Sequence, residues 1–241
     1  MAKPYDNDQT KKEQVREMFD HIAPRYDLLD YNTSPPVTTA RLWRRHVVRI
    51  VRRCRPRHVL DVATGTGDLA IEMARRIPGV RVLGVDLSQR MLETARRKVA
   101  ARGLDERVLL EEGDAEHLTV AAASVDVATV AFGVRNFENL EAGLRELHRV
   151  LKPGGKVVIL EFSRPRNRIF RALYEFYSYR VLPCIGGAIS HDKRAYEYLP
   201  VSVGEFPAPE AFLSLLARAG FSDCRSRSQS FGIAQIYTGV K

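Results

Sequence analysis

A glycine-rich turn that follows a buried apolar run constrains the fold of this chain more than any other feature of its sequence. The run covers residues 57–63 and leads into Gly65-Thr66-Gly67, after which a helix-forming segment begins at Asp68. Glycine at these positions lets the backbone turn sharply and lets a ligand approach it, which a Cβ would prevent. A strand, a glycine turn and a helix in this order predict a nucleotide site at the carboxyl end of a parallel strand.

The rest of the chain continues to alternate strand and helix patterns. Strands are predicted over residues 57–63, 80–85, 107–112, 125–131 and 156–162, and helices over 68–77, 88–102 and 140–151. Such repeats require parallel pairing with right-handed crossovers, so we predict a doubly wound α/β sheet. A helix over 208–219 and two strands over 223–228 and 233–240 follow. The short connection between these strands predicts an antiparallel hairpin that closes one edge of a seven-stranded sheet.

Length and composition fit one soluble domain with an appendage. The 241 residues are 45% apolar and 28% charged, which are ordinary values for a globular protein. We expect a helical lid over residues 1–56 and a main domain over 57–241, with a substrate-side insertion at about 164–207. The polar N-terminus lacks the apolar stretch of a signal peptide, so we expect a cytoplasmic location. The three widely spaced cysteines indicate neither a disulfide framework nor a metal site.

The excess of basic residues is unevenly placed. The net charge is +9, and no acidic residue stands between Asp30 and Asp61. The same segment holds Arg41, Arg44, Arg45, Arg49, Arg52, Arg53, Arg55 and Arg57. Such a face suits nucleic acid or an anionic membrane surface, and it is equally typical of a solvated, arginine-rich helix.

Three carboxylates stand where a bound nucleotide would need them. Asp86 ends the second predicted strand, where it can accept both hydroxyls of an adenosine ribose. Asp61 gives the pattern D-x-x-x-G-x-G, and a carboxylate there attracts the ammonium of a methionine moiety but repels a pyrophosphate. Asp114 follows the third strand, where it can accept the adenine amino group. Because Gly65-x-Gly67-x-x-Ala70 also matches the dinucleotide fingerprint, NAD is a competing cofactor.

These features, together with the closing hairpin, resemble the class I S-adenosylmethionine-dependent methyltransferases, whose Rossmann-like sheet carries an extra antiparallel strand. A more specific resemblance begins near Val15 and covers nearly the whole remaining chain. Its motifs are AFGVRNF at 131–137, LEFSRP at 160–165 and YEYLPVS at 196–202. They resemble the C-methyltransferases of menaquinone and ubiquinone biosynthesis.

This resemblance implies transfer of the methyl group of S-adenosylmethionine to a ring carbon of a prenylated naphthoquinol or benzoquinol. The turn and the resemblance together give the cofactor site Asp61, Ala63, Thr64, Gly65, Thr66, Gly67, Asp86, Leu87, Asp114, Ala115 and Ala131. No metal is expected in the reaction.

The resemblance also points to catalytic residues. A quinol carbon becomes nucleophilic when a neighbouring hydroxyl loses its proton, and a phenol with a pKa of ~10 needs help to do so at neutral pH. Arg135 and Asn136 follow the fourth strand, and the arginine charge can stabilise a phenolate or orient a water. Tyr26 is a lid residue over the site, while His191 and Asp192 are candidate proton acceptors.

One stretch departs from the family pattern. Asp30 stands where asparagine is expected, Pro36 where glycine is expected, and the approach to Trp43 is two residues longer. Adjacent prolines at 35 and 36 exclude a continuous helix through this point. The departure affects the lid and leaves the cofactor site unchanged.

The sequence also makes predictions about partners. Aromatic and basic residues recur at helical spacing over 164–183, which predicts peripheral binding to the inner face of the cell membrane. Nucleic acid is not expected as a substrate, because AFGVRNF lacks the Pro-Pro and aromatic pattern of base methyltransferases. An RNA methyltransferase, another small-molecule methyltransferase and a non-catalytic cofactor-binding scaffold are the alternatives. The sequence leaves open whether the chain forms a homodimer.

Overall fold

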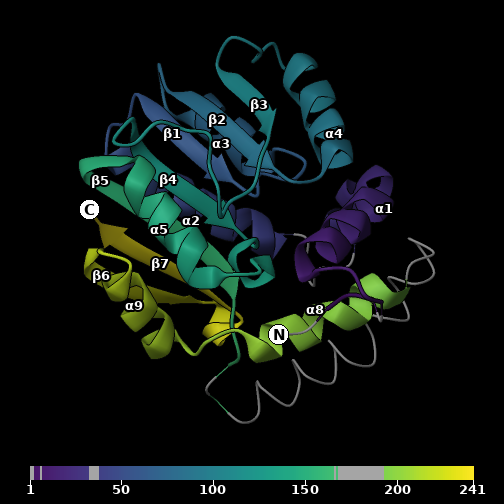
Figure 1. The fold of residues 1–241 in the computed structure, drawn as a ribbon. Coiled ribbons are helices and arrows are strands. Elements are labelled where there is room, and N and C mark those ends of the chain that lie inside the picture. Colours follow the sequence, from purple (N-terminus) through teal and green to yellow (C-terminus); the bar gives the residue numbers. More distant parts are fainter. Residues whose placement is uncertain (1–2, 6, 33–37, 166, 168–192) are drawn as a thin grey trace.

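A computed structural model describes residues 3–5, 7–32, 38–165, 167 and 193–241. Its centre is one seven-stranded sheet with the order β3-β2-β1-β4-β5-β7-β6 (Figure 1). The strands are β1 His58–Val62, β2 Arg81–Asp86, β3 Val108–Glu112, β4 Val125–Ala131, β5 Leu151–Phe162, β6 Ser222–Gln229 and β7 Ala234–Val240. The first five strands pair in parallel. The predicted doubly wound sheet is confirmed.

The closing hairpin is confirmed as well. β7 lies antiparallel to β5, where Ile159 is opposite Tyr237, and β6 lies antiparallel to β7 at the sheet edge. The turn between them contains a short 3-10 helix, η3 Ser230–Gly232. Strand β5 differs from the prediction, because it begins at Leu151 rather than at Lys156. In its pairing with β4, Leu151 lies opposite Val125 and Lys156 lies opposite Val127, so the register shifts between these two pairs. The predicted turn at 152–155 is therefore an irregular start of β5.

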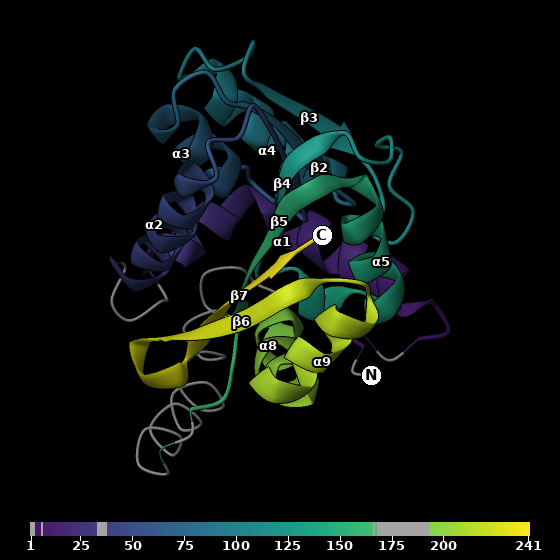
Figure 2. The same ribbon diagram turned by 90° about the vertical axis from the view of Figure 1, so that its left-hand side faces the viewer.

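Helices cover both faces of the sheet, which explains why its central strands are apolar throughout. Figure 2 shows α2 Thr38–Arg53 and α3 Asp68–Arg76 on one side, and α5 Leu140–Val150 and α9 Pro209–Arg218 on the other. Alternate residues of β1 divide between these layers: Val59 packs with α2 and α3, and Leu60 packs with α5 and α9. The predicted helices therefore lie where the doubly wound fold requires them.

Two helices begin at the caps that their sequences provide. The Ser88 hydroxyl accepts the backbone N–H of Met91 at 3.1 Å, so α4 Gln89–Ala100 starts immediately after this serine. The Asn139 side chain accepts the N–H of Ala142 at 3.0 Å at the start of α5. Both caps satisfy backbone donors that would otherwise lack a partner.

The N-terminal segment is helical, as expected, and its two helices have different surroundings. Helix α1 Lys11–Asn32 packs against α4 and α8 Lys193–Glu205 through Val15, Met18 and Ile22 (Figure 1). Helix α2 instead buries Trp43, Val47 and Val51 in the same core as β1 and α3. The division of the chain at residue 56 stays a prediction, as does the insertion at about 164–207.

The departure from the family pattern falls mainly in the gap between α1 and α2. Positions 33–37, which include Pro36, and residues 168–192 lie outside the described residues. The helix predicted for membrane binding falls almost entirely in the second of these gaps. Among the described helices, none is long and apolar enough to cross a membrane.

Candidate functional site

The carboxyl ends of β1, β2, β3 and β4 meet at one edge of the sheet, and α1 lies over them. A cavity opens between the strand ends and this helix. It is lined from the strand ends by Ala63, Gly65, Asp86, Leu87, Asp114, Ala115, Ala131, Phe132, Gly133 and Asn136, and from α1 by Lys12, Val15, Arg16, Phe19 and Tyr26. Seven of the eleven predicted cofactor residues thus line one cavity.

Close backbone packing shapes this edge at two glycines. Gly67 has φ +77°, and a Cβ there would lie 3.1 Å from the Cβ of Ala95 on α4. Gly133 follows β4, and its Cβ would lie 2.5 Å from the Cβ of Ala63 after β1. The two strand ends therefore approach each other as closely as glycine alone allows.

Asp86 holds the glycine turn against the end of β2. Its carboxylate accepts the N–H of Gly65 at 2.7 Å and the N–H of Ser88 at 2.9 Å. Burial nevertheless raises the pKa of Asp86 to about 6, because desolvation outweighs these hydrogen bonds. Asp86 also lines the cavity, so a ligand with hydroxyl donors would supply compensating interactions for its carboxylate.

Asp61 lies deeper than the cavity wall. It is 1% exposed, and its two oxygens accept the hydroxyls of Thr64 at 2.7 Å and Thr129 at 2.6 Å. Burial raises the pKa of Asp61 to about 6. Neither Asp61 nor Thr64 belongs to the cavity lining, and the contact of Asp61 with a methionine ammonium stays a prediction.

The turn residues Thr66 and Gly67 also lie outside the cavity lining. Gly67 starts α3, and Thr66 is buried, with its hydroxyl accepting Lys98 Nζ at 3.1 Å. Lys98 also pairs with Asp68 at the first position of α3. These contacts tie the turn to α4, so Thr66 shapes the turn without lining the cavity.

Asp114 already has a basic partner in this structure. Its Oδ2 lies 2.6 Å from Lys12 Nζ of α1, and its Oδ1 accepts the N–H of Glu116 at 2.9 Å. These hydrogen bonds hold the pKa of the Asp114 carboxyl below its usual range despite desolvation, which acts in the opposite direction. A second tie between α1 and the sheet joins Asp20 Oδ1 to the Ser88 hydroxyl at 2.6 Å.

Arg135 is buried and forms an ion pair with Glu161 near the end of β5. Its Nη1 lies 2.8 Å from Glu161 Oε1 and donates to the carbonyl of Phe132 at 2.6 Å. The exposed fractions of the two charged side chains are 8% and 0%. Burial opposes the charge of Arg135, but Glu161 outweighs it and raises the arginine pKa. The guanidinium therefore stays charged and is neutralised locally by Glu161.

Asn136, the residue that follows Arg135 in the sequence, lines the cavity. Its Oδ1 accepts the hydroxyl of Tyr198 from α8 at 3.2 Å. Burial raises the pKa of Tyr198 to about 12, so this hydroxyl stays protonated and keeps donating. Tyr26 lines the same cavity from α1, whereas His191 and Asp192 lie outside the described residues.

The cavity face of α1 and the aromatic residue after β4 were not predicted from the sequence. Lys12, Val15, Arg16 and Phe19 recur at helical spacing and line the cavity together. This spacing was available in the sequence, but it does not reveal which partner the helix face covers. Phe132 lies within the AFGVRNF segment and was not assigned a role.

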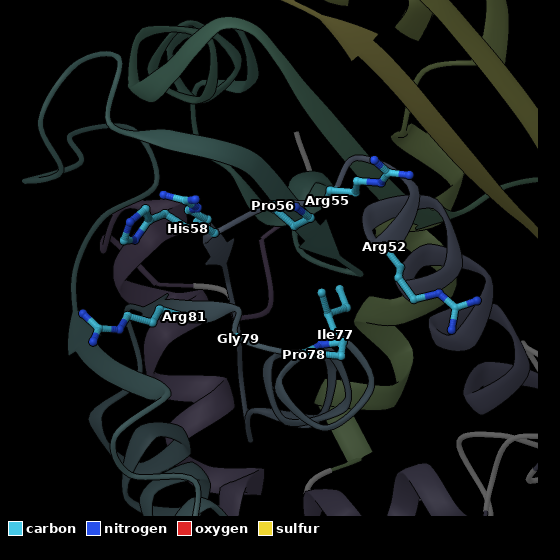
Figure 3. Close-up of a pocket in the computed structure, with 9 residues that line it drawn as sticks. Arg52, Arg55, Pro56, His58, Ile77, Pro78, Gly79 and Arg81 are labelled. Atoms are coloured by element: carbon cyan, nitrogen blue, oxygen red, sulfur yellow. The ribbon is translucent and has the colours of Figure 1, made fainter.

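The arginine-rich segment lies partly in a second hollow at the opposite, amino edge of the sheet. Figure 3 shows Arg52, Arg55, His58 and Arg81 around the turn formed by residues 77–79. Two other arginines of this segment pair with α3, since Arg44 lies 3.4 Å from Asp68 and Arg45 lies 3.8 Å from Glu72. The basic excess is thus divided between helix packing and a surface remote from the cavity.

Comparison with protein families gives a match over almost the whole chain. Residues 7–241 match the sequence model of the ubiE/COQ5 methyltransferase family. Curated relatives are similar over most of their lengths. A ubiquinone/menaquinone biosynthesis C-methyltransferase UbiE from Geobacter sulfurreducens is 49% identical, over 96% of this chain and 90% of the relative. A demethylmenaquinone methyltransferase from Bacteroides fragilis is 41% identical, over 99% and 97% of the two chains.

Solved structures share the fold at low sequence identity. The [4+2]-cyclase SpnF has a TM-score of 0.71 at 19% identity and covers 97% of each chain. A SAM-dependent methyltransferase from Aquifex aeolicus has a TM-score of 0.56 at 16% identity, with 95% and 96% coverage. Because one of these neighbours is named as a cyclase, the shared fold by itself does not assign a reaction.

Proposed function

Since the chain belongs to the ubiE/COQ5 methyltransferase family, we propose that it is an S-adenosylmethionine-dependent C-methyltransferase that converts demethylmenaquinol to menaquinol in isoprenoid quinone biosynthesis. The observation that carries this proposal is the cavity in which the glycine turn, Asp86 and Asn136 meet beneath α1. It lies at the carboxyl edge, where open α/β sheets bind nucleotides.

The lining of the cavity fits an adenosyl cofactor. The half-buried Asp86 suits the two hydroxyls of a ribose, because it lines the cavity and hydrogen bonds from these hydroxyls would stabilise a carboxylate that burial disfavours. Asp114 and Ala115 stand at the end of β3, where Asp114 would accept the adenine amino group. The methionine portion would pass Gly65 and Ala131, with Asp61 acting through Thr64 behind the turn. The cofactor, when bound, supplies the methyl group.

The chemistry at the ring requires removal of a phenolic proton. In the proposed reaction the ring carbon would take the methyl group as the methyl–sulfur bond breaks and leaves a neutral thioether. The ring carbon would then lose its proton to water and the phenolate would regain one, so that one proton is released overall. Asn136, held by Tyr198, would orient the quinol hydroxyl or a water beside it. Arg135 does not itself line this cavity, but its buried Nε has no hydrogen-bond partner among the described residues, and we propose that it donates to a buried water that links it to the site.

Peripheral association with the membrane is part of the proposal. A prenylated quinol resides in the bilayer, so the enzyme must dock on the membrane surface or extract its substrate. The net charge of +9 favours an anionic surface, and the aromatic and basic run over 164–183 has the composition of an interfacial helix. We place the enzyme in the cytoplasm, at the inner face of the cell membrane.

The direct test supplies the purified chain with S-adenosylmethionine and demethylmenaquinol carrying a short prenyl chain. Mass spectrometry should detect a product heavier by one methyl group, carried on the ring carbon. A matched reaction with NAD in place of S-adenosylmethionine is the control for the competing cofactor. Binding of S-adenosylmethionine without methyl transfer to any prenylated quinol would favour the scaffold alternative, and tight binding of NAD alone would contradict the proposal.

A further inference from the structure

The residue after β4 has a backbone conformation that its side chain disfavours. Phe132 has φ +60°, in the left-handed region where glycine and asparagine are usual. A bulky aromatic residue persists there only when its surroundings hold it, and such outliers concentrate at functional sites. Phe132 also lines the cavity described above, so the strained residue stands at the proposed site itself.

Both backbone polar groups of Phe132 are held from β5 and from Arg135. Its N–H donates to the carbonyl of Leu160 at 2.7 Å. Its carbonyl accepts Arg135 Nη1 at 2.6 Å, and the same guanidinium is fixed by Glu161. The buried ion pair therefore fixes the backbone of Phe132 in addition to any role at the ring. Arg135 is a positioning residue in this respect.

The Phe132 ring belongs to an aromatic wall that we define as Trp43, Phe132 and Phe162. The rings of Phe132 and Phe162 are stacked, with centroids 4.5 Å apart and planes at 29°. The Trp43 ring lies 6.2 Å from each of them, and the Arg135 guanidinium lies 5.5 Å from the centre of the Phe162 ring. Phe162 and Trp43 thus both pack against the Phe132 ring at the end of the sheet.

The cavity has aromatic residues on its helical side as well. Phe19 and Tyr26 line it from α1, with ring centroids 6.4 Å apart. Asn136, the proposed partner of a quinol hydroxyl, lines the same cavity. A flat ring entering between α1 and the end of β4 would therefore meet aromatic side chains and the amide of Asn136, with Lys12 and Arg16 of α1 also lining the cavity, and this combination suits an aromatic diol.

We propose that Phe132 is the surface on which the quinol ring stacks, and that the clamp formed by Leu160, Arg135 and Glu161 holds this phenylalanine in its strained conformation for that purpose. This inference deepens the proposed function and rests on it. Phe132 sets the position of the ring relative to Asn136, whereas the cofactor contacts at Asp86 and Asp114 are independent of it. Loss of the ring should weaken quinol binding and spare cofactor binding.

The test compares Phe132→Leu with Phe132→Tyr, which retains a stacking surface. Phe221→Leu is a matched control, because Phe221 lies just before β6, near the edge of the sheet opposite the cavity. Its ring packs edge-to-face on the ring of His148, with the ring centroids 5.1 Å apart. The probes are a 1,4-naphthoquinone with one prenyl group and its reduced quinol. Trp43 is the only tryptophan in the chain and lies beside Phe132, so quenching of its fluorescence reports quinone binding.

Phe132→Leu should weaken quinone quenching and raise the quinol KM by about tenfold, the scale of a lost aromatic stack and its buried area. The Kd of S-adenosylmethionine should stay within about twofold, Phe132→Tyr should raise the quinol KM less than Phe132→Leu does, and Phe221→Leu should keep the wild-type quinol KM. Unchanged quenching and KM in a folded Phe132→Leu protein would overturn the inference. So would equal losses of quinol and cofactor binding, because these would indicate a purely structural role.

The two proposals fail in different ways. If the wild-type chain binds the quinone and S-adenosylmethionine but transfers no methyl group, the proposed function fails. The quenching comparison between Phe132→Leu and the wild type would still decide the ring site. If the wild-type chain does not bind the naphthoquinone at all, the ring site is refuted.

Discussion

Arg135 and Glu161 form a buried ion pair that links the loop after β4 to the end of β5, with Nη1 and Oε1 2.8 Å apart. Glu161 is completely buried, and its carboxylate also accepts the backbone N–H of Phe162 at 2.8 Å. In the described part of the chain, this pair thus connects a predicted catalytic residue to the aromatic wall.

Removing one member of this pair should be costly to the fold. Glu161→Leu leaves Arg135 charged and buried, which should lower the free energy of unfolding by about 3–5 kcal/mol. The double variant Arg135→Met/Glu161→Leu should lose less of its free energy of unfolding than Glu161→Leu alone, since no unpaired charge remains. Urea denaturation measures both, and Glu141→Ala at the exposed Arg218 pair is the control, with little change expected. A mild effect of Glu161→Leu would mean that water reaches the site.

Arg135→Ala should act on turnover more than on cofactor binding. Loss of the guanidinium removes the charge that we propose to stabilise the phenolate and releases the Phe132 carbonyl, so kcat should fall about a hundredfold. The Kd of S-adenosylmethionine, measured by calorimetry on the folded variant, should be nearly constant. Wild-type turnover in this variant would remove Arg135 from the mechanism.

Asp86→Ala should weaken the binding of S-adenosylmethionine by about 2–3 kcal/mol, because a cavity carboxylate that accepts hydrogen bonds from two hydroxyls makes charge-assisted hydrogen bonds. Part of this loss would come from the glycine turn, whose Gly65 N–H also depends on Asp86. Asp86→Asn retains the shape and serves as the comparison in calorimetry. Equal affinity in the wild type and both variants would place the ribose elsewhere.

Cofactor affinity should fall as the pH is lowered through about 6. The pKa values of Asp61 and Asp86 are raised from 3.8 to about 6, so the free protein binds protons that a ligand requiring the carboxylates must displace. If the ligand requires only the Asp86 carboxylate, which lines the cavity, the Kd at pH 5 should be about tenfold higher than at pH 7. The same shifts mean that the free energy of unfolding decreases as the pH rises from about 4 to about 6, because the folded state holds the extra protons. A pH-independent Kd between 5 and 7 would contradict the carboxylate contacts.

Membrane binding should be reversible and sensitive to salt. Each basic residue near an anionic surface contributes ~1 kcal/mol, and this attraction decays over a Debye length of ~8 Å at physiological ionic strength. Sedimentation with anionic vesicles should retain the protein at low salt and release it as salt increases, with neutral vesicles as the control. Equally negligible binding to both kinds of vesicle would exclude the peripheral association.

The sequence determined where most strands and helices lie along the chain and which residues form the main wall of the cavity, because these depend on local signals. Apolar runs, Ser88 and Asn139 as caps, and glycines at 65 and 67 fix where strands end and helices begin. In a parallel sheet the strand ends share one edge, so Asp86, Asp114 and Ala131 had to lie close together. The aromatic content of the 131–137 segment was visible, but its role was not.

Only the tertiary structure decided which partner each polar side chain takes. Asp61 bonds to Thr129, Arg135 to Glu161 and Asp114 to Lys12, and each pair joins segments far apart in the sequence. Such contacts depend on how helices and strands pack, and charge or spacing along one segment does not encode them. The left-handed conformation of Phe132 has the same origin, since contacts from β5 and Arg135 hold a phenylalanine where local preference favours glycine.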